Sequence, residues 1–65
     1  MPEKWTGDIT AIMHIHRITG MQLAKELGYT KEYVSMVLNG KRSPAGAEQK
    51  FREAINRILQ EKGQG

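Results

Sequence analysis

The stretch that decides the fold is GMQLAKELGYTKEYVSMVLNG, residues 20–40, which predicts two short helices on either side of a tight turn. The first helix is introduced by Thr19, and Gln22 follows three residues later in the arrangement of a reciprocal capping box. It ends at Gly28, which can adopt the left-handed conformation that follows many helices. The second helix is introduced by Thr30 as its N-cap, and Asn39-Gly40 is expected to stop it. Both helices therefore have clear end signals.

Small residues stand where two steeply crossing helices need them. Helices joined by so short a turn bring their backbones close together, so the residue at the contact must be small. Ala24 occupies that position between Leu23 and Leu27, and Val34 is expected to pack onto the crossing. A small residue, a glycine four positions later and a β-branched residue six positions after that is the spacing of the DNA-binding helix-turn-helix. We therefore predict such a motif at about residues 19–39.

A helix is predicted before this pair. Its apolar face is expected to consist of residues at spacings of three and four, Ile9, Ile12, Met13 and His16. Thr6 or Asp8 is expected to cap its start, and Trp5 just ahead is expected to cover the end of the core. His16 is interpreted as a histidine at the edge of the core, near the end of the helix.

A fourth helix is predicted after the pair. Ser43 is expected to be its N-cap and Pro44 its first residue, because proline is favoured at that position. The buried face is expected to consist of Ala47, Phe51, Ala54, Ile55 and Ile58. The outer face carries two oppositely charged pairs at i,i+4 spacing, Glu48 with Arg52 and Glu53 with Arg57.

The composition indicates one small all-α domain. The chain has 65 residues, 38% of them hydrophobic, and no cysteine. We expect a single domain over residues 1–65, ordered over about residues 6–60, with flexible ends at Met1 to Lys4 and Glu61 to Gly65. The segments predict a compact bundle of four, or five, short helices. No stretch is apolar enough to cross a bilayer or to act as a signal peptide, so we expect a cytoplasmic protein without membrane contact.

The predicted core draws on all four helices. It comprises Ile9, Ile12, Met13, Ile18, Leu23, Ala24, Leu27, Val34, Val37, Leu38, Phe51, Ile55 and Ile58.

Catalysis and metal binding find little support in the composition. With no cysteine, a single aspartate and no cluster of histidines and carboxylates, the chain lacks a nucleophile arrangement, and we expect no enzyme activity. His14 and His16 are two residues apart on a helix, so their side chains point to different sides and cannot chelate one ion. No metal, cofactor or small-molecule substrate is expected.

Three stretches, ITGMQLAKELGYT, YVSMVLNGKRSP and AEQKFREAINRIL, carry a resemblance to a known family. The chain resembles the lambda-repressor-like, Cro and xenobiotic-response-element-type helix-turn-helix domains from Asp8 to Leu59, and is most similar to short phage or prophage regulators of Gram-positive bacteria. The resemblance implies the lambda-repressor-like fold and sequence-specific binding of double-stranded DNA by a transcriptional regulator. It favours a repressor over an activator, and a homodimer on DNA.

The helix at about residues 30–39 is the predicted recognition helix, and we expect it to lie in the major groove of DNA. With Val34, Val37 and Leu38 inward, its opposite face can reach base edges. Lysine can donate to guanine, glutamate can accept from cytosine N4, serine can bond to either polar edge, and methionine can touch a thymine methyl. The candidate base-reading residues are Lys31, Glu32, Ser35 and Met36.

Contacts with the DNA backbone are expected on both sides of this face. Lys41 and Arg42, with the Asn39 amide, would lie beside the sugar-phosphate backbone. The family also places phosphate contacts at the start of the preceding helix, here Gly20 and Met21. The family often has glutamine where this chain has Gly20, so only backbone amides remain there. Tyr33 could contact a phosphate or pack at the turn.

A protein-interaction module of the same fold, such as an antitoxin or adapter, is the alternative interpretation. The formal net charge of +3 and a pI near 9.5 indicate an anionic partner only weakly. Lys31, Lys41 and Arg42 around the outward face favour DNA over a protein partner.

Overall fold

Four α-helices form the structure, a computed structural model that describes residues 4–64. They are α1 (Lys4–His16), α2 (Gly20–Leu27), α3 (Lys31–Leu38) and α4 (Ala47–Gln64), and residues 4–64 contain no strand. The predicted all-helical class is therefore confirmed. Of the segments expected to be flexible, residues 1–3 and 65 lie outside the described residues.

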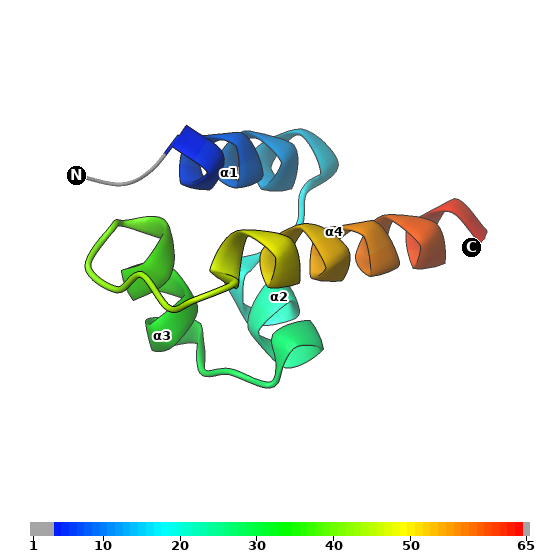
Figure 1. Cartoon of the computed structure of the whole chain (residues 1–65). Coiled ribbons are helices and arrows are strands. Elements are labelled where there is room, and N and C mark those ends of the chain that lie inside the picture. The colour runs from blue at the N-terminus through cyan, green and yellow to red at the C-terminus, as the bar shows by residue number, and fades with distance from the viewer. Residues whose placement is uncertain (1–3, 65) are drawn as a thin grey trace.

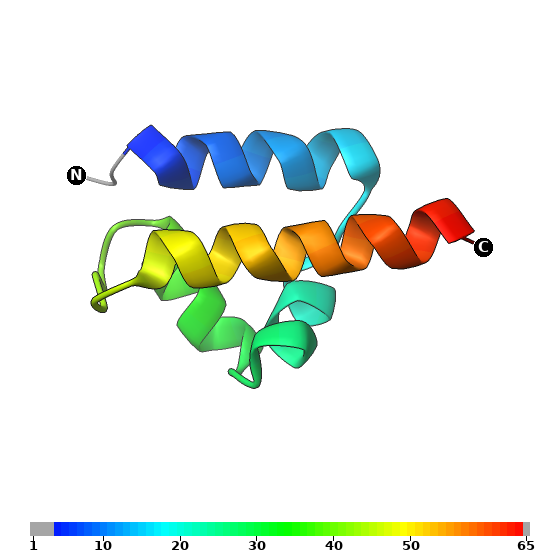
Figure 2. The same ribbon diagram turned by 45° about the vertical axis from the view of Figure 1, so that its right-hand side comes forward.

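The helices are arranged in two levels (Figure 1). The α1 and α4 helices lie side by side and run in the same direction, and the shorter α2 and α3 lie below them. The α2 helix packs against both α3 and α4, while α1 also contacts α3 (Figure 2). The radius of gyration over the Cα atoms is 11.1 Å. This arrangement leaves one side of α3 facing away from the other helices.

The core lies between the two levels. Every helix contributes to it, and its buried apolar residues are Ile9, Met13, Ile18, Leu23, Ala24, Val34, Val37, Ala47, Phe51, Ala54, Ile55 and Ile58. Most of the predicted core is thus confirmed, but Ile12, Leu27 and Leu38 are only half-buried and pack at its edge. The Trp5 ring meets Phe51 edge-on, with centroids 5.5 Å apart, and so covers one end of the core as predicted.

The α1 helix begins and ends differently from the prediction. It begins at Lys4, so Thr6 and Asp8 lie inside the helix, and the prediction that either one caps it was wrong; Thr6 is buried. At the other end Arg17 has a φ of 58°, and the Ile18 N–H donates to the Met13 carbonyl at 2.8 Å. This is the bonding of a Schellman motif, which normally places glycine where Arg17 stands.

His16 is exposed, contrary to its predicted position at the edge of the core. It is the last residue of α1, and the chain turns away immediately after it. Its carbonyl oxygen accepts a hydrogen bond of 2.6 Å from the Lys62 side chain on α4. One of the carbonyls left without a helical donor at the end of α1 is therefore satisfied from the neighbouring helix.

The α4 helix begins later and continues further than predicted. It begins at Ala47, so the assignment of Ser43 and Pro44 to its N-cap and first position was wrong. Gly46 has a φ of 73°, which is not helical, and the Ala47 N–H donates to the Pro44 carbonyl in a preceding turn. The helix then continues to Gln64, through most of the segment that was expected to be loose.

Ion pairs fasten α4 to the other helices. The predicted Glu48–Arg52 pair is present at 3.0 Å, and Arg52 also lies 3.7 Å from Asp8 on α1. The prediction of a Glu53–Arg57 pair was wrong, because Arg57 instead pairs with Glu26 on α2 at 3.1 Å.

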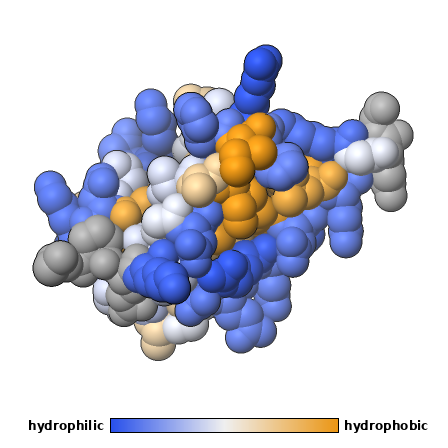
Figure 3. All heavy atoms as spheres, turned by 90° about the horizontal axis from the view of Figure 1, so that it is seen from above, coloured by the Kyte–Doolittle hydropathy of each residue, from blue (hydrophilic) through white to orange (hydrophobic). Residues whose placement is uncertain are grey.

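A strip of hydrophobic atoms crosses the otherwise hydrophilic surface seen from above α1 (Figure 3). On α1, Ile15 is 71% exposed, and on α2, Met21 is 65% exposed. Within the described residues, none of the four helices combines the length and the apolar character needed to span a bilayer.

Candidate functional site

The connection between α2 and α3 is set by hydrogen bonds at the ends of both helices. The Thr19 hydroxyl accepts the Gln22 N–H at 3.0 Å and the Gln22 side chain accepts the Thr19 N–H at 3.3 Å, which confirms the capping box. At the other end of α2, Gly28 is left-handed with a φ of 79°. The N–H groups of Gly28 and Tyr29 both donate to the Ala24 carbonyl. Three residues therefore suffice to redirect the chain from α2 into α3.

The rotation of α3 about its own axis follows from its cap and its buried residues. The Thr30 hydroxyl accepts the Tyr33 N–H at 3.1 Å, as predicted. Val34 and Val37 are buried, which turns the opposite side of the helix to solvent. Three of the four candidate base-reading residues are exposed, Lys31, Glu32 and Ser35. Met36 is half-buried, so its side chain lies at the margin of the exposed face.

The chain folds back over the last turn of α3. Asn39 is the C-cap, and its side-chain amide donates to the Ser35 hydroxyl at 3.2 Å. Gly40 follows with a φ of 81°. The N–H groups of Lys41 and Arg42 then both donate to the Met36 carbonyl, at 2.9 and 3.3 Å. Two basic residues are thereby held directly beside the exposed face of α3 by their main chain.

Positive charge in this region is not neutralised locally. Residues 31–42 contain Lys31, Lys41 and Arg42 against Glu32 alone, so three positive charges minus one negative charge leave +2. In the described part of the chain the ion pairs lie elsewhere, around Arg52 and Arg57 of α4. The exposed face of α3 and the segment after it are therefore suited to an anionic partner.

The start of α2 offers a second group of predicted contacts. Gly20 and Met21 are its first two residues, at the end opposite the turn into α3, and the helix rises by roughly 10 Å from Gly20 to Leu27. The first N–H groups of a helix have no acceptor within the helix, and here the Thr19 hydroxyl accepts the N–H of Gln22. The amides of Gly20 and Met21 thus remain the ones suited to an anion.

Tyr33 packs against Tyr29 at the turn. Their rings meet at 68° with centroids 4.9 Å apart, and both are half-buried. Of the two alternatives for Tyr33, packing at the turn is therefore observed, and its contact with a phosphate stays a prediction.

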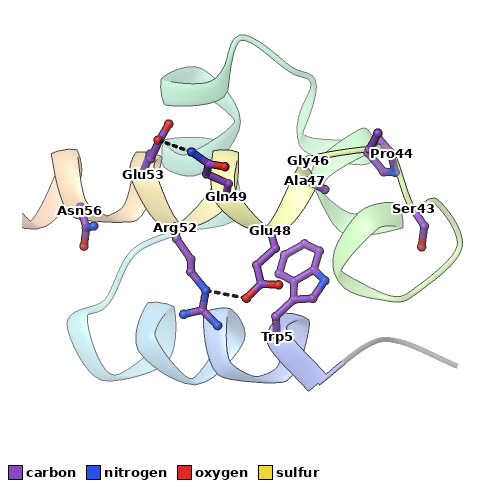
Figure 4. A pocket seen from close by; sticks show the side chains of 11 residues that line it. Trp5, Ser43, Pro44, Gly46, Ala47, Glu48, Gln49, Arg52, Glu53 and Asn56 are labelled. Carbon is purple, nitrogen blue, oxygen red and sulfur yellow. Dashed lines mark hydrogen bonds and ion pairs between the residues drawn. The ribbon is translucent and has the colours of Figure 1, made fainter.

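A surface hollow of about 670 Å³ lies between the start of α1, the segment before α4 and the first turns of α4 (Figure 4). Trp5 lines it, and Glu48 and Arg52 point from α4 toward α1, where they pair with each other. None of the predicted contact residues lines this hollow. Among the described residues, no three histidine or carboxylate side chains form a group that could hold a metal ion.

Two features of the site were not anticipated from the sequence. The Ser35–Asn39 hydrogen bond follows the i,i+4 spacing at which side chains meet on a helix, so that spacing could have indicated it. The bond from the Lys41 N–H to the Met36 carbonyl, with the left-handed Gly40 before it, is the bonding of a Schellman motif, which the predicted helix stop at Gly40 could have indicated. The additional bond from the Arg42 N–H to the same carbonyl has no such sequence signal.

Comparisons with known proteins give no relative for this chain. No family model matches it, and no match was found among curated proteins or among solved structures.

Proposed function

We propose that the protein binds double-stranded DNA in a sequence-specific manner through the exposed face of α3, with the helix-turn-helix formed by α2 and α3. The observation that carries this proposal is the exposed face itself. Lys31, Glu32 and Ser35 point to solvent from a helix whose two ends are held by hydrogen bonds, and two cations follow at once. An α-helix is about 10 to 12 Å wide with its side chains, which fits the B-DNA major groove of about 12 Å.

Each group has a role in this complex. Lys31, Glu32, Ser35 and Met36 face base edges, with the two ionised side chains as the strongest readers. The backbone contacts fall to Gly20, Met21, Tyr33, Asn39, Lys41 and Arg42. Contacts of this second kind position the domain without reading sequence.

The biological role that this binding supports is that of a transcriptional regulator, of the phage or prophage type by resemblance, and a repressor rather than an activator. One copy offers a single recognition helix, so we propose that two copies bind two half-sites as a homodimer on DNA.

The test is selection of bound sites from random duplex DNA by the full chain, followed by affinity measurements on the selected site and on random duplex. The expected result is a defined site, tighter binding to it than to random DNA, and a loss of affinity with salt on both. The slope of log affinity against log salt concentration gives the number of phosphates contacted, because each contact contributes about 0.9 to that slope. Binding that is absent at low salt, or identical for all sequences, contradicts the proposal.

A protein-interaction module, such as an antitoxin or adapter, is the second candidate. Two observations favour it: a strip of hydrophobic atoms crosses the surface seen in Figure 3, and the Ile15 side chain on α1 is 71% exposed. Retention on heparin and on random duplex DNA separates the two candidates, because only a DNA-binding surface requires salt-dependent retention on both.

A further inference from the structure

Ser35 and Asn39 form one hydrogen-bonded unit on the exposed face of α3. The Asn39 side-chain Nδ2 donates to the Ser35 Oγ at 3.2 Å, and the Asn39 main-chain N–H donates to the Ser35 carbonyl at 2.9 Å. The hydrogen bond between the two side chains lies in an exposed place. The Asn39 side chain is therefore held by one bond to the Ser35 hydroxyl, and an ordinary helical bond fixes the backbone that carries it.

This bond decides which part of the Asn39 amide is presented to a partner. An asparagine amide has a carbonyl oxygen that only accepts and an NH2 group with two donors. One donor is used by Ser35, which fixes the orientation of the amide and leaves the second N–H of Nδ2 available to another acceptor. A phosphate accepts hydrogen bonds and donates none, so the free N–H suits it and the amide oxygen does not.

The surroundings call for such a fixed donor. Asn39 caps the C-terminus of α3, where the helix dipole is negative and disfavours an anion. Lys41 and Arg42, whose main chains are anchored on the Met36 carbonyl, bring two positive charges to the same end of the helix. A phosphate at this place would meet two cations and one oriented neutral donor.

We propose that Ser35 is a positioning residue, which orients the Asn39 amide toward a phosphate of the DNA backbone and does not itself read a base. This inference rests on the proposed DNA binding. It narrows the sequence readout to Lys31, Glu32 and Met36, and it moves Ser35 from the base-reading group to the backbone-binding group.

The first experiment measures affinity for the selected site and for random duplex with Ser35→Ala, Asn39→Ala, the double variant and Ser35→Thr. Each single alanine variant is expected to weaken binding about two- to fivefold, which is the effect of one ordinary hydrogen bond. For a given variant, the loss is expected to be equal on the selected site and on random duplex. The double variant is expected to match Asn39→Ala, because Ser35 has no effect without the amide it orients. Ser35→Thr keeps the hydroxyl and is expected to remain close to the parent.

The second experiment follows the Asn39 side-chain NH2 group by NMR in the protein without DNA. Ser35→Ala is expected to shift its resonances, while Ser35→Thr leaves them near their original place. Alanine is a better helix former than serine, so Ser35→Ala is expected to fold and to melt no earlier than the parent.

Each other outcome overturns the inference. A changed ratio of specific to random affinity in Ser35→Ala means that Ser35 reads a base, and additive effects in the double variant mean that the two residues act separately. Unchanged affinities, or unchanged NH2 resonances in Ser35→Ala, also overturn it. A parent protein that does not bind DNA removes the proposed function itself, whereas a parent that binds with any of these patterns removes only the role of Ser35.

Discussion

The Arg57 guanidinium on α4 lies 3.1 Å from the Glu26 carboxylate on α2, which joins residues 31 positions apart in the chain. The Arg57 side chain is 51% exposed and that of Glu26 is 24% exposed. The pair links the lower level of the fold to the long helix above it. Since Arg57 is half in solvent, its attraction to Glu26 is screened and modest.

A double-mutant cycle on this pair tests its strength. Glu26→Gln, Arg57→Gln and the combined variant are expected to give a coupling of about 0.5 kcal/mol in the free energy of unfolding, decreasing with added salt. Urea denaturation provides the measurement. The matched control is Glu53→Gln, which is expected to show no coupling to Arg57; a larger coupling there than at Glu26 would contradict the observed pairing.

Replacing Arg17 with glycine is expected to stabilise the protein. Arg17 holds a left-handed backbone with a φ of 58°, which is unfavourable for a residue with a Cβ atom and easy for glycine. Arg17→Gly should raise the free energy of unfolding by about 0.5 to 1 kcal/mol. Arg17→Ala is the control, because it removes the same charge and keeps the Cβ atom. Equal stability of the two variants would show that the backbone is not strained.

Enlarging Ala24 is expected to destabilise the contact of α2 with its neighbours. Ala24 is buried, and its carbonyl also holds the turn into α3. Ala24→Leu should overpack this place and lower the free energy of unfolding by about 1 to 3 kcal/mol. Ala11→Leu, at an exposed position of α1, is the control and should cost little. An unchanged melting curve for Ala24→Leu would refute the tight helix crossing.

Neutralising Lys41 or Arg42 is expected to weaken DNA binding regardless of sequence. Each contact with a phosphate releases counterions, so Lys41→Ala and Arg42→Ala should each reduce the slope of log affinity against log salt by about one unit. Lys62→Ala removes one charge from the last turn of α4, at the end of that helix away from α3, and serves as the control (Figure 1). If all three variants behave alike, the charges after α3 act only through net charge.

Lys31 and Glu32 are expected to determine sequence preference. A lost base contact costs about 1 to 3 kcal/mol on the preferred site and little on random DNA. Lys31→Ala and Glu32→Ala should therefore lower the ratio of specific to random affinity, and Glu32→Ala should bind random DNA at least as well as the parent. Lys25→Ala, on α2, is the control for a removed surface charge. Parent-like ratios for both α3 variants would mean that this face does not read bases.

The ends of α2 and α3 could be predicted because their signals are local. Thr19 and Gln22 bond across three residues, Gly28 supplies a left-handed backbone by itself, and Thr30 caps the helix that comes directly after it. The buried side of α3 could be read from the spacing of Val34 and its neighbours. The orientation of the exposed face could therefore be anticipated before any tertiary contact was known.

The features that were missed depend on contacts between distant parts of the chain. Trp5 packs on Phe51, which is consistent with α1 beginning ahead of the polar residues that resemble a cap. Arg57 pairs with Glu26 on another helix instead of Glu53 on its own. The start of α4 was missed for a different reason, because Gly46 after Ser43 and Pro44 takes a positive φ and delays the helix.

The single carbonyl of Met36 accepts the N–H groups of both Lys41 and Arg42, and neither bond involves a side chain. Any residue except proline can therefore stand at these two positions without altering the path of the backbone. The chemical pattern on α3 is likewise independent of the side chains at these two positions. Under natural selection, the charge that follows α3 can thus vary by single substitutions while the backbone at this end of the helix keeps its course.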